Sequence, residues 1–226
     1  MKGVLTAAFA LSLSAGAAMA APLSAEALER WFQSDDPAPP DSSVADVNGG
    51  DLSFLDTKPA RAVHHHQNAL SIAPSSLRDG WVRLAQCHHN LDAVSRVHIQ
   101  FRPGRVRDLV IRRADNIGDA SVEGASVKLT DVGHGASLCL EAWTRALRQN
   151  DDGTYSLRSG PFMRKFLDGY YPMQVSMKVD FTDSGLDPVA ITPAAQKGFE
   201  IERGTGELSY EAWFEGRLVT EITFAD

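Results

Sequence analysis

The sequence predicts an all-β protein, an antiparallel β-sandwich of about nine or ten strands. One observation is the alternation of apolar and polar residues over 97–101, 175–181 and 208–214, with a further alternating run before the C-terminus. Such alternation is typical of strands with one buried and one exposed face. The other observation is the turn chemistry between these runs, as in Asn150-Asp151-Asp152-Gly153, which favours hairpin connections.

Residues 1–20 are predicted to be a secretory signal peptide. Lys2 gives a basic start, an Ala- and Leu-rich apolar run follows, and Ala18-Met19-Ala20 places small residues where a signal peptidase reads them. The mature chain is therefore expected to begin near Ala21 and to work in the periplasm or outside the cell. Because residue 21 is Ala and not Cys, no lipid anchor is expected.

Residues 21–60 are predicted to form a flexible arm. This range is rich in Pro, Asp and Gly and poor in large apolar side chains, so it buries too little surface to offset its ordering entropy. The exception is a short helix predicted over 24–33, which Ser24 would cap and whose apolar face would carry Leu28, Trp31 and Phe32. This helix either packs on the main domain or binds a partner.

Residues 61–226 are predicted to form the sandwich domain, with one inserted helix over about 161–168. Pro161 suits a first helical position and Gly169 a stop, while Phe162 and Phe166 would share an apolar side. The helix would either plug an open end of the sandwich or line an aromatic ligand site. The rim of that ligand site would consist of Arg164, Tyr170 and Tyr171.

Cys87 and Cys139 are the only two cysteines and are predicted to form a disulfide, because an exported chain folds in an oxidising compartment. Closing a loop of this length would stabilise the fold by about 4 kcal/mol. The sequence has no C-x-x-C motif, which argues against a thioredoxin-type oxidoreductase. The alternative is a catalytic thiolate, which would need a histidine and an orienting partner.

Five of the seven histidines fall in two clusters, 64–66 and 88–89. In an extended segment His64 and His66 point to the same face, while His88 and His89 point to opposite faces and His89 shares the side of Cys87. If the two segments pair as neighbouring strands, three imidazoles converge on a site that suits copper or zinc. The candidate metal ligands are His64, His66, His88 and His89.

Two observations oppose a metal site. The histidine spacing matches no closed zinc motif, and a disulfide at Cys87 removes the one thiolate ligand nearby. Exposed histidine runs can also be merely polar surface.

Charge and missing motifs exclude several functions. The net charge is −7, and removal of the signal with its single lysine makes it −8 (−7 − 1), which argues against a nucleic-acid or anionic-membrane partner. After the signal no apolar run approaches the roughly 20 residues of a membrane helix. Nucleophile-elbow, zincin, Walker and dinucleotide-binding motifs are also missing from the sequence.

Three functional hypotheses follow. The first is a non-enzymatic binding or accessory protein of the cell envelope that meets another envelope protein through residues 21–60. The second is a periplasmic copper- or zinc-binding protein that uses the histidine clusters. The third is a cofactor-free hydrolase, for which Asp92 and Glu141 are the candidate carboxylates. A monomer is expected in each case.

Overall fold

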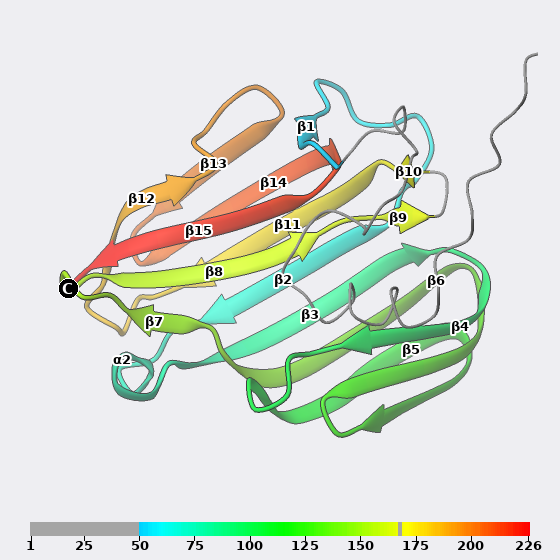
Figure 1. The fold of residues 1–226 in the computed structure, drawn as a ribbon, viewed down its shortest axis with the longest axis horizontal. Helices are drawn as coiled ribbons and strands as arrows, with labels where there is room; N and C mark the ends of the chain where they lie inside the picture. The colour runs from blue at the N-terminus through cyan, green and yellow to red at the C-terminus, as the bar shows by residue number, and fades with distance from the viewer. Residues whose placement is uncertain (1–49, 167–168) are drawn as a thin grey trace, which may run out of the picture. The chain divides into compact units, whose positions relative to one another are not determined.

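The structure is a computed structural model that describes residues 50–166 and 169–226. Strands dominate this part of the chain, and the helix α2 (Ser76–Asp79) has only four residues. Figure 1 shows two facing layers of mostly antiparallel strands. The predicted all-β, sandwich-like fold is therefore confirmed. None of the helices described is long and apolar enough to cross a membrane.

The described chain contains fifteen strands, more than the nine or ten predicted, because several have only two or three residues and such short pairings leave no alternation in a sequence. The strands are β1 (Ser53–Phe54), β2 (His65–Ser71), β3 (Trp81–Leu91), β4 (Val94–Gln100), β5 (Val106–Glu123), β6 (Ser126–Arg145), β7 (Leu147–Gln149), β8 (Tyr155–Phe162), β9 (Lys165–Phe166), β10 (Gly169–Tyr170), β11 (Met173–Asp180), β12 (Asp187–Thr192), β13 (Phe199–Gly204), β14 (Glu207–Glu215) and β15 (Leu218–Ala225).

The larger layer is a nine-stranded sheet with the order β1-β14-β11-β2-β3-β6-β4, in which β13 also pairs with β14 and β5 with β6. The smaller layer is a four-stranded sheet, β12-β15-β8-β7, and β9 and β10 form a separate two-stranded pair. Among the strands described, every pairing is antiparallel except that of β2 with β11, which is parallel. The first long strand of the domain therefore lies beside a strand from its last third.

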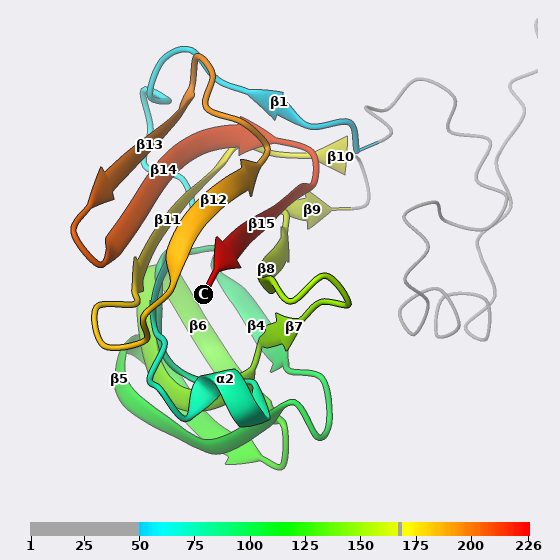
Figure 2. The same cartoon turned by 90° about the vertical axis from the view of Figure 1, so that its left-hand side faces the viewer.

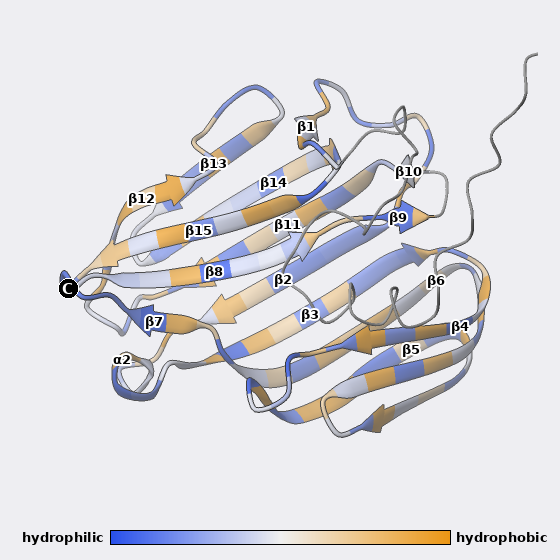
Figure 3. Cartoon of the chain, viewed as in Figure 1, coloured by the Kyte–Doolittle hydropathy of each residue, from blue (hydrophilic) through white to orange (hydrophobic). Residues whose placement is uncertain are grey.

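The main core lies between the two layers. The large sheet contributes the apolar faces of β11 and β14, including Val175, Val179 and Phe214, and the small sheet contributes β8 and β15, including Leu157 and Phe224. These side chains are almost completely buried. Figure 3 shows the alternation of apolar and polar residues along β11, β14 and β15 that the sequence predicted.

A second core lies where β3, β4, β5 and β6 bend. β3 pairs with the second half of β6 and β4 with its first half. Near the point where β3 ends, the pairing of β6 with β3 shifts register between His88 and Leu91, and its pairing with β5 shifts between Asp115 and Ile117. Asn90, Asn116 and Asp131 have positive φ there, a conformation that Asn and Asp tolerate better than most residues. Figure 2 shows the resulting curvature of β5 and β6. The curved strands enclose Leu91, Val127, Leu129, Val132, Ala136, Leu138 and Leu140.

The predicted inserted helix is wrong for residues 161–166, because β8 runs through Pro161 to Phe162 and β9 follows at Lys165. Residues 167 and 168 lie outside the described residues. Phe162 pairs with Leu218 of β15 and is buried in the main core. This long-range pairing overrides the local helix signals, as tertiary packing commonly does.

The signal peptide predicted over 1–20 and the helix predicted over 24–33 lie outside the described residues. Of the predicted arm, only residues 50–60 are described. There β1 pairs with β14, and Phe54 stacks on Phe199 with ring centroids 5.0 Å apart. The end of the predicted arm therefore contributes a strand to the large sheet.

Candidate functional site

The two histidine clusters lie side by side on the paired strands β2 and β3. His65 is opposite His89, and His66 is opposite His88. The chain reaches this register through α2, which ends at Gly80 in a left-handed conformation with φ 75°, a cap that glycine adopts without steric cost. The condition on which the sequence prediction of converging imidazoles depended is thus met.

Alternation divides the histidines between the two faces of the sheet. His64, His66 and His88 gather on the inner face, where the rings of His66 and His88 are 4.3 Å apart and those of His64 and His88 5.3 Å apart, centroid to centroid. His65 and His89 form a second pair, 5.6 Å apart, on the outer face. Of the four candidate ligands, His89 therefore lies on the other face from the rest, as the predicted alternation of His88 and His89 requires. The inner-face histidines His64, His66 and His88 are called the histidine cluster below.

The histidine cluster is hydrogen-bonded within itself and to neighbouring amides. His64 Nε2 and His88 Nδ1 are 3.1 Å apart. Gln86 Nε2 donates to His66 Nε2 and also to Asn68 Oδ1, the latter over 3.1 Å. The ring of Phe162, from the opposite sheet, meets His66 edge-on. One aromatic ring and one amide thus contact His66, and a second amide binds the first.

Three buried polar atoms, one in the histidine cluster and two beside it, have no hydrogen-bond partner among the described residues. They are His88 Nε2, Gln86 Oε1 and Asn68 Nδ2, and their residues are 5–8 % exposed. Only one other buried side-chain atom of the described chain, Arg217 Nε, shares this condition. Buried polar groups in proteins are nearly always satisfied. Three of the four exceptions in the described chain therefore lie at the histidine cluster.

Burial keeps the three imidazoles neutral. It lowers the pKa of His64 from 6.5 to about 4 and that of His88 to about 3, and it holds the pKa of His66 well below its usual value. The charge of Asp92 opposes the shift at His64 but is the smaller effect. At neutral pH each ring therefore keeps a nitrogen lone pair, the form in which histidine binds metal ions.

An ion pair adjoins the cluster at His64. Arg164 donates from Nη2 to Asp92 Oδ1 over 2.6 Å and from Nε to Oδ2 over 3.0 Å, a two-point contact typical of strong arginine–carboxylate pairs. The charges of both residues act on His64. The same guanidinium lies 5.3 Å from the ring centroid of Phe166 and 5.5 Å from that of Tyr171.

The predicted ligand rim is thus assembled only in part. Arg164 and Tyr171 contact each other beside the histidine cluster. Tyr170 pairs with Lys165, whose ammonium group lies 5.3 Å from its ring, so it belongs to a different contact. Asp92, which pairs with Arg164, lies 72 residues away in sequence. A single sequence holds no signal for such a distant pair.

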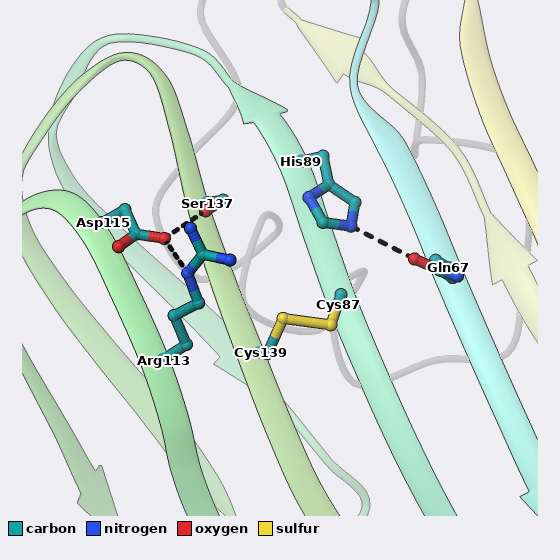
Figure 4. Close-up of a disulfide and its surroundings, with 7 residues drawn as sticks. All are labelled: Gln67, Cys87, His89, Arg113, Asp115, Ser137 and Cys139. Carbon is teal, nitrogen blue, oxygen red and sulfur yellow. Dashed lines mark hydrogen bonds and ion pairs between the residues drawn. A yellow bond between two sulfur atoms is a disulfide. The ribbon is translucent and has the colours of Figure 1, made fainter.

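Cys87 and Cys139 form the predicted disulfide between β3 and β6 (Figure 4). The two residues are directly opposite in the ladder, with Cα atoms 4.1 Å apart. The disulfide lies on the outer face with His89, whose Nε2 is 3.2 Å from Gln67 Oε1. Neither sulfur is therefore available as a thiolate, either for the histidine cluster or as a nucleophile.

The two carboxylates considered for hydrolysis do not form a catalytic pair. Asp92 binds Arg164 beside His64, whereas Glu141 lies on the outer face and binds Arg83 and Arg112. Glycoside hydrolysis needs two carboxyl groups on either side of one bond. Asp92 and Glu141 therefore give no support to the hydrolase hypothesis.

The fit of the histidine cluster to a metal ion is partial. In their present conformations, no three His, Cys, Asp or Glu side chains of the described chain are arranged to hold a metal ion. His64 and His88, however, place two ring nitrogens 3.1 Å apart. Two nitrogens bound tetrahedrally to one zinc ion at about 2.0–2.1 Å are about 3.3–3.4 Å apart. The separation of these two nitrogens is thus near that of two ligands on one ion, although here they face each other in a hydrogen bond.

No family model matches the sequence, and no curated protein is significantly similar to it. Among solved structures, a mutant M1 zinc metallopeptidase from Deinococcus radiodurans bound to a Tyr-Ser-Ala substrate has 12 % identity and a TM-score of 0.40, over 78 % of this chain and 43 % of that one. The M1 zinc metallopeptidase from the same organism without the substitution has 14 % identity and a TM-score of 0.38, over the same shares. The chain spans less than half the length of these proteins. A similarity at this level assigns neither a family nor a function.

Proposed function

We propose that this protein is an exported, non-enzymatic β-sandwich protein that binds a copper or zinc ion through His64, His66 and His88. The observation that carries the proposal is the convergence of three imidazoles, that of His88 buried and those of His64 and His66 half-buried, on the inner face of β2 and β3. Imidazole nitrogens suit both metals, and copper is expected to bind the more tightly because Cu²⁺ exceeds Zn²⁺ in the usual affinity order.

The chemistry around the cluster supports this proposal. A metal ion would replace the contact between His64 and His88 and draw His66 away from Gln86. His88 Nε2 and Gln86 Oε1 lack partners within the described residues, so the polar groups of the site are not committed to one fixed network.

Two features support export as part of the proposal. The signal peptide predicted over 1–20 directs the chain out of the cytoplasm. The disulfide between Cys87 and Cys139 is of the kind that persists in an oxidising compartment such as the periplasm. The envelope partner predicted to bind residues 21–60 stays a prediction, because 21–49 lie outside the described residues.

The test is metal binding by untagged mature protein and by two double variants. His64→Leu/His88→Gln removes the preset pair of ring nitrogens, whereas His65→Leu/His89→Gln changes the same strands on the opposite face. We expect the native protein and the outer-face variant to take up one equivalent of copper or zinc by calorimetry and elemental analysis, and the inner-face variant to take up none. Circular dichroism confirms that each variant is folded.

Two results contradict the proposal. One is a native protein that binds neither Cu²⁺ nor Zn²⁺ at micromolar concentration. The other is equal loss of binding in the inner-face and outer-face variants, which would assign any uptake to surface histidines.

A further inference from the structure

The outer face of β3, β6 and β5 presents a continuous set of tryptophan and arginine side chains. Trp143 on β6 is opposite Arg83 on β3 and, on its other side, opposite Arg107 on β5. The ladder places these residues on the face opposite the histidine cluster, because they alternate with buried Val82, Leu84 and Ala142. Together with neighbouring residues they form what we call the Trp–Arg face: Trp81, Arg83, Arg107, Arg112, Glu141 and Trp143.

Two indole rings position one guanidinium on this face. The guanidinium carbon of Arg107 lies 4.4 Å from the ring centroid of Trp81 and 5.7 Å from that of Trp143. Stacking on aromatic rings restrains the plane of an arginine while its N–H groups stay available at the edge of that plane. The Arg107 side chain is 50 % exposed, and its Nε lies 4.0 Å from Oδ2 of Asp108, a side chain that is 74 % exposed. It is therefore a restrained cation that solvent can reach.

Glu141 restrains two more arginines without using up their hydrogen-bonding capacity. Its Oε2 accepts from Nη2 of Arg112 over 2.9 Å and from Nη2 of Arg83 over 3.3 Å. The bond from Arg112, with that from Arg83, holds the pKa of Glu141 below its usual value. Each guanidinium has five N–H donors, and the two side chains are 58 % and 60 % exposed. Both arginines keep donors for another anion.

A shallow depression lies on the Trp–Arg face, with a volume of about 470 Å³. Its wall combines Arg83, Asp108, Arg112 and Glu141 with apolar groups of Leu109, Val110 and Trp143. Val110 is 41 % exposed, which makes it one of the few large apolar side chains of the described chain that solvent reaches to this extent. The depression therefore offers an apolar surface directly beside cationic groups.

We propose that the Trp–Arg face docks an acidic segment of a partner protein, one in which carboxylates are interspersed with aliphatic side chains. The Trp–Arg face and its depression together hold three arginines, Arg83, Arg107 and Arg112, against two acids, Glu141 and Asp108. In a chain whose net charge is −7, this small local excess of positive charge is complementary to carboxylates. Tryptophan and arginine are the residues that most often dominate binding energy at protein interfaces. The apolar wall favours a peptide over a purely polar anionic polysaccharide.

This interaction is separate from the proposed metal site, because the two sets of side chains occupy opposite faces of β3. The probe is a fluorescent peptide of glutamates with interspersed leucines, titrated with mature protein at low and high salt and followed by anisotropy. Arg107→Gln, Arg112→Gln and Trp143→Leu should each weaken binding roughly tenfold. Arg158→Gln, an exposed arginine on β8 of the other sheet, is the matched control and should change binding less than twofold.

The comparison ligands decide the identity of the partner. A peptide with lysine in place of glutamate should not bind, and polygalacturonate should bind at least tenfold more weakly than the glutamate peptide. The proposal is overturned if the glutamate peptide does not bind, if the lysine peptide or polygalacturonate binds as tightly, or if Arg158→Gln weakens binding as much as Arg107→Gln. Melting curves by circular dichroism establish that each variant is folded.

Discussion

The two faces of β3 have opposite chemistry although they alternate along one strand. The inner face carries Gln86 and His88 among buried apolar side chains, whereas the outer face carries Arg83, Cys87 and His89. Burial removes charge from the inner histidines, while solvent allows the outer face to keep several full charges. Two histidines that are adjacent in sequence, His88 and His89, therefore lie in different environments because they lie on opposite sides of β3.

A permanent charge placed on each face in turn should give the largest difference between the two faces. His88→Lys buries an ammonium group beside His64 and should lower the free energy of unfolding by about 5 kcal/mol. His89→Lys puts the same group on the outer face and should change stability by less than about 0.5 kcal/mol. Urea denaturation measures both. Equal effects would contradict the assignment of the faces.

The disulfide tests whether the outer face also stabilises the fold. It closes a loop of 52 residues, for which loop-closure entropy predicts about 4 kcal/mol of stabilisation. Cys87→Ala/Cys139→Ala should therefore unfold at clearly lower urea concentration than the native protein. Reduction of the native protein should lower the urea concentration of unfolding by a similar amount. A variant as stable as the oxidised protein would contradict a stabilising role of the disulfide.

Acidification should destabilise the protein through its inner face. The pKa of His88 is about 3 in the folded protein and near 6.5 when unfolded, so between these values the unfolded chain binds more protons. The free energy of unfolding is therefore highest above pH 6.5 and falls as the pH drops. For this residue alone the loss is roughly 3 kcal/mol at pH 4.5. His88→Gln should flatten the pH dependence of urea unfolding in this range, and an unchanged slope would count against a neutral, buried His88.

The smallest effect is expected at the ion pair beside the cluster. Asp92→Asn weakens the two-point contact with Arg164, which is 20 % exposed, and should cost about 1 kcal/mol. The exposed pair of Lys178 with Glu207 is the control, since Glu207→Gln should cost less than about 0.5 kcal/mol. Thermal unfolding resolves the two. A larger effect at Glu207 would reverse the expected order.

Local periodicity was sufficient to predict the fold class and the division of side chains between faces. It correctly placed Val175 and Val179 in the core and separated His88 from His89. It failed where a distant segment decides the conformation, as at Phe162, whose pairing with Leu218 replaced the helix that Pro161 and Gly169 indicated.

The candidate sites show the same limit. The H-x-H spacing showed that His64 and His66 share a face, but only the register of β2 with β3 brings His88 to them. The Trp–Arg face was missed altogether. In the sequence, Arg83 and Trp143 each stand at polar-facing positions of a segment in which apolar and polar residues alternate. That the two residues are neighbours depends on the pairing of β3 with β6, which no local pattern contains.

The parallel pairing of β2 with β11 has a consequence for the order in which the molecule folds. β2 is the first long strand, yet one of its two neighbours is not synthesised until residues 173–180. The sheet on which the histidine cluster depends therefore cannot close until about four fifths of the chain is available. Contacts so distant in sequence fold slowly, and until β11 arrives one edge of β2 stays open to pairing with other chains. Folding yield should accordingly fall as protein concentration rises.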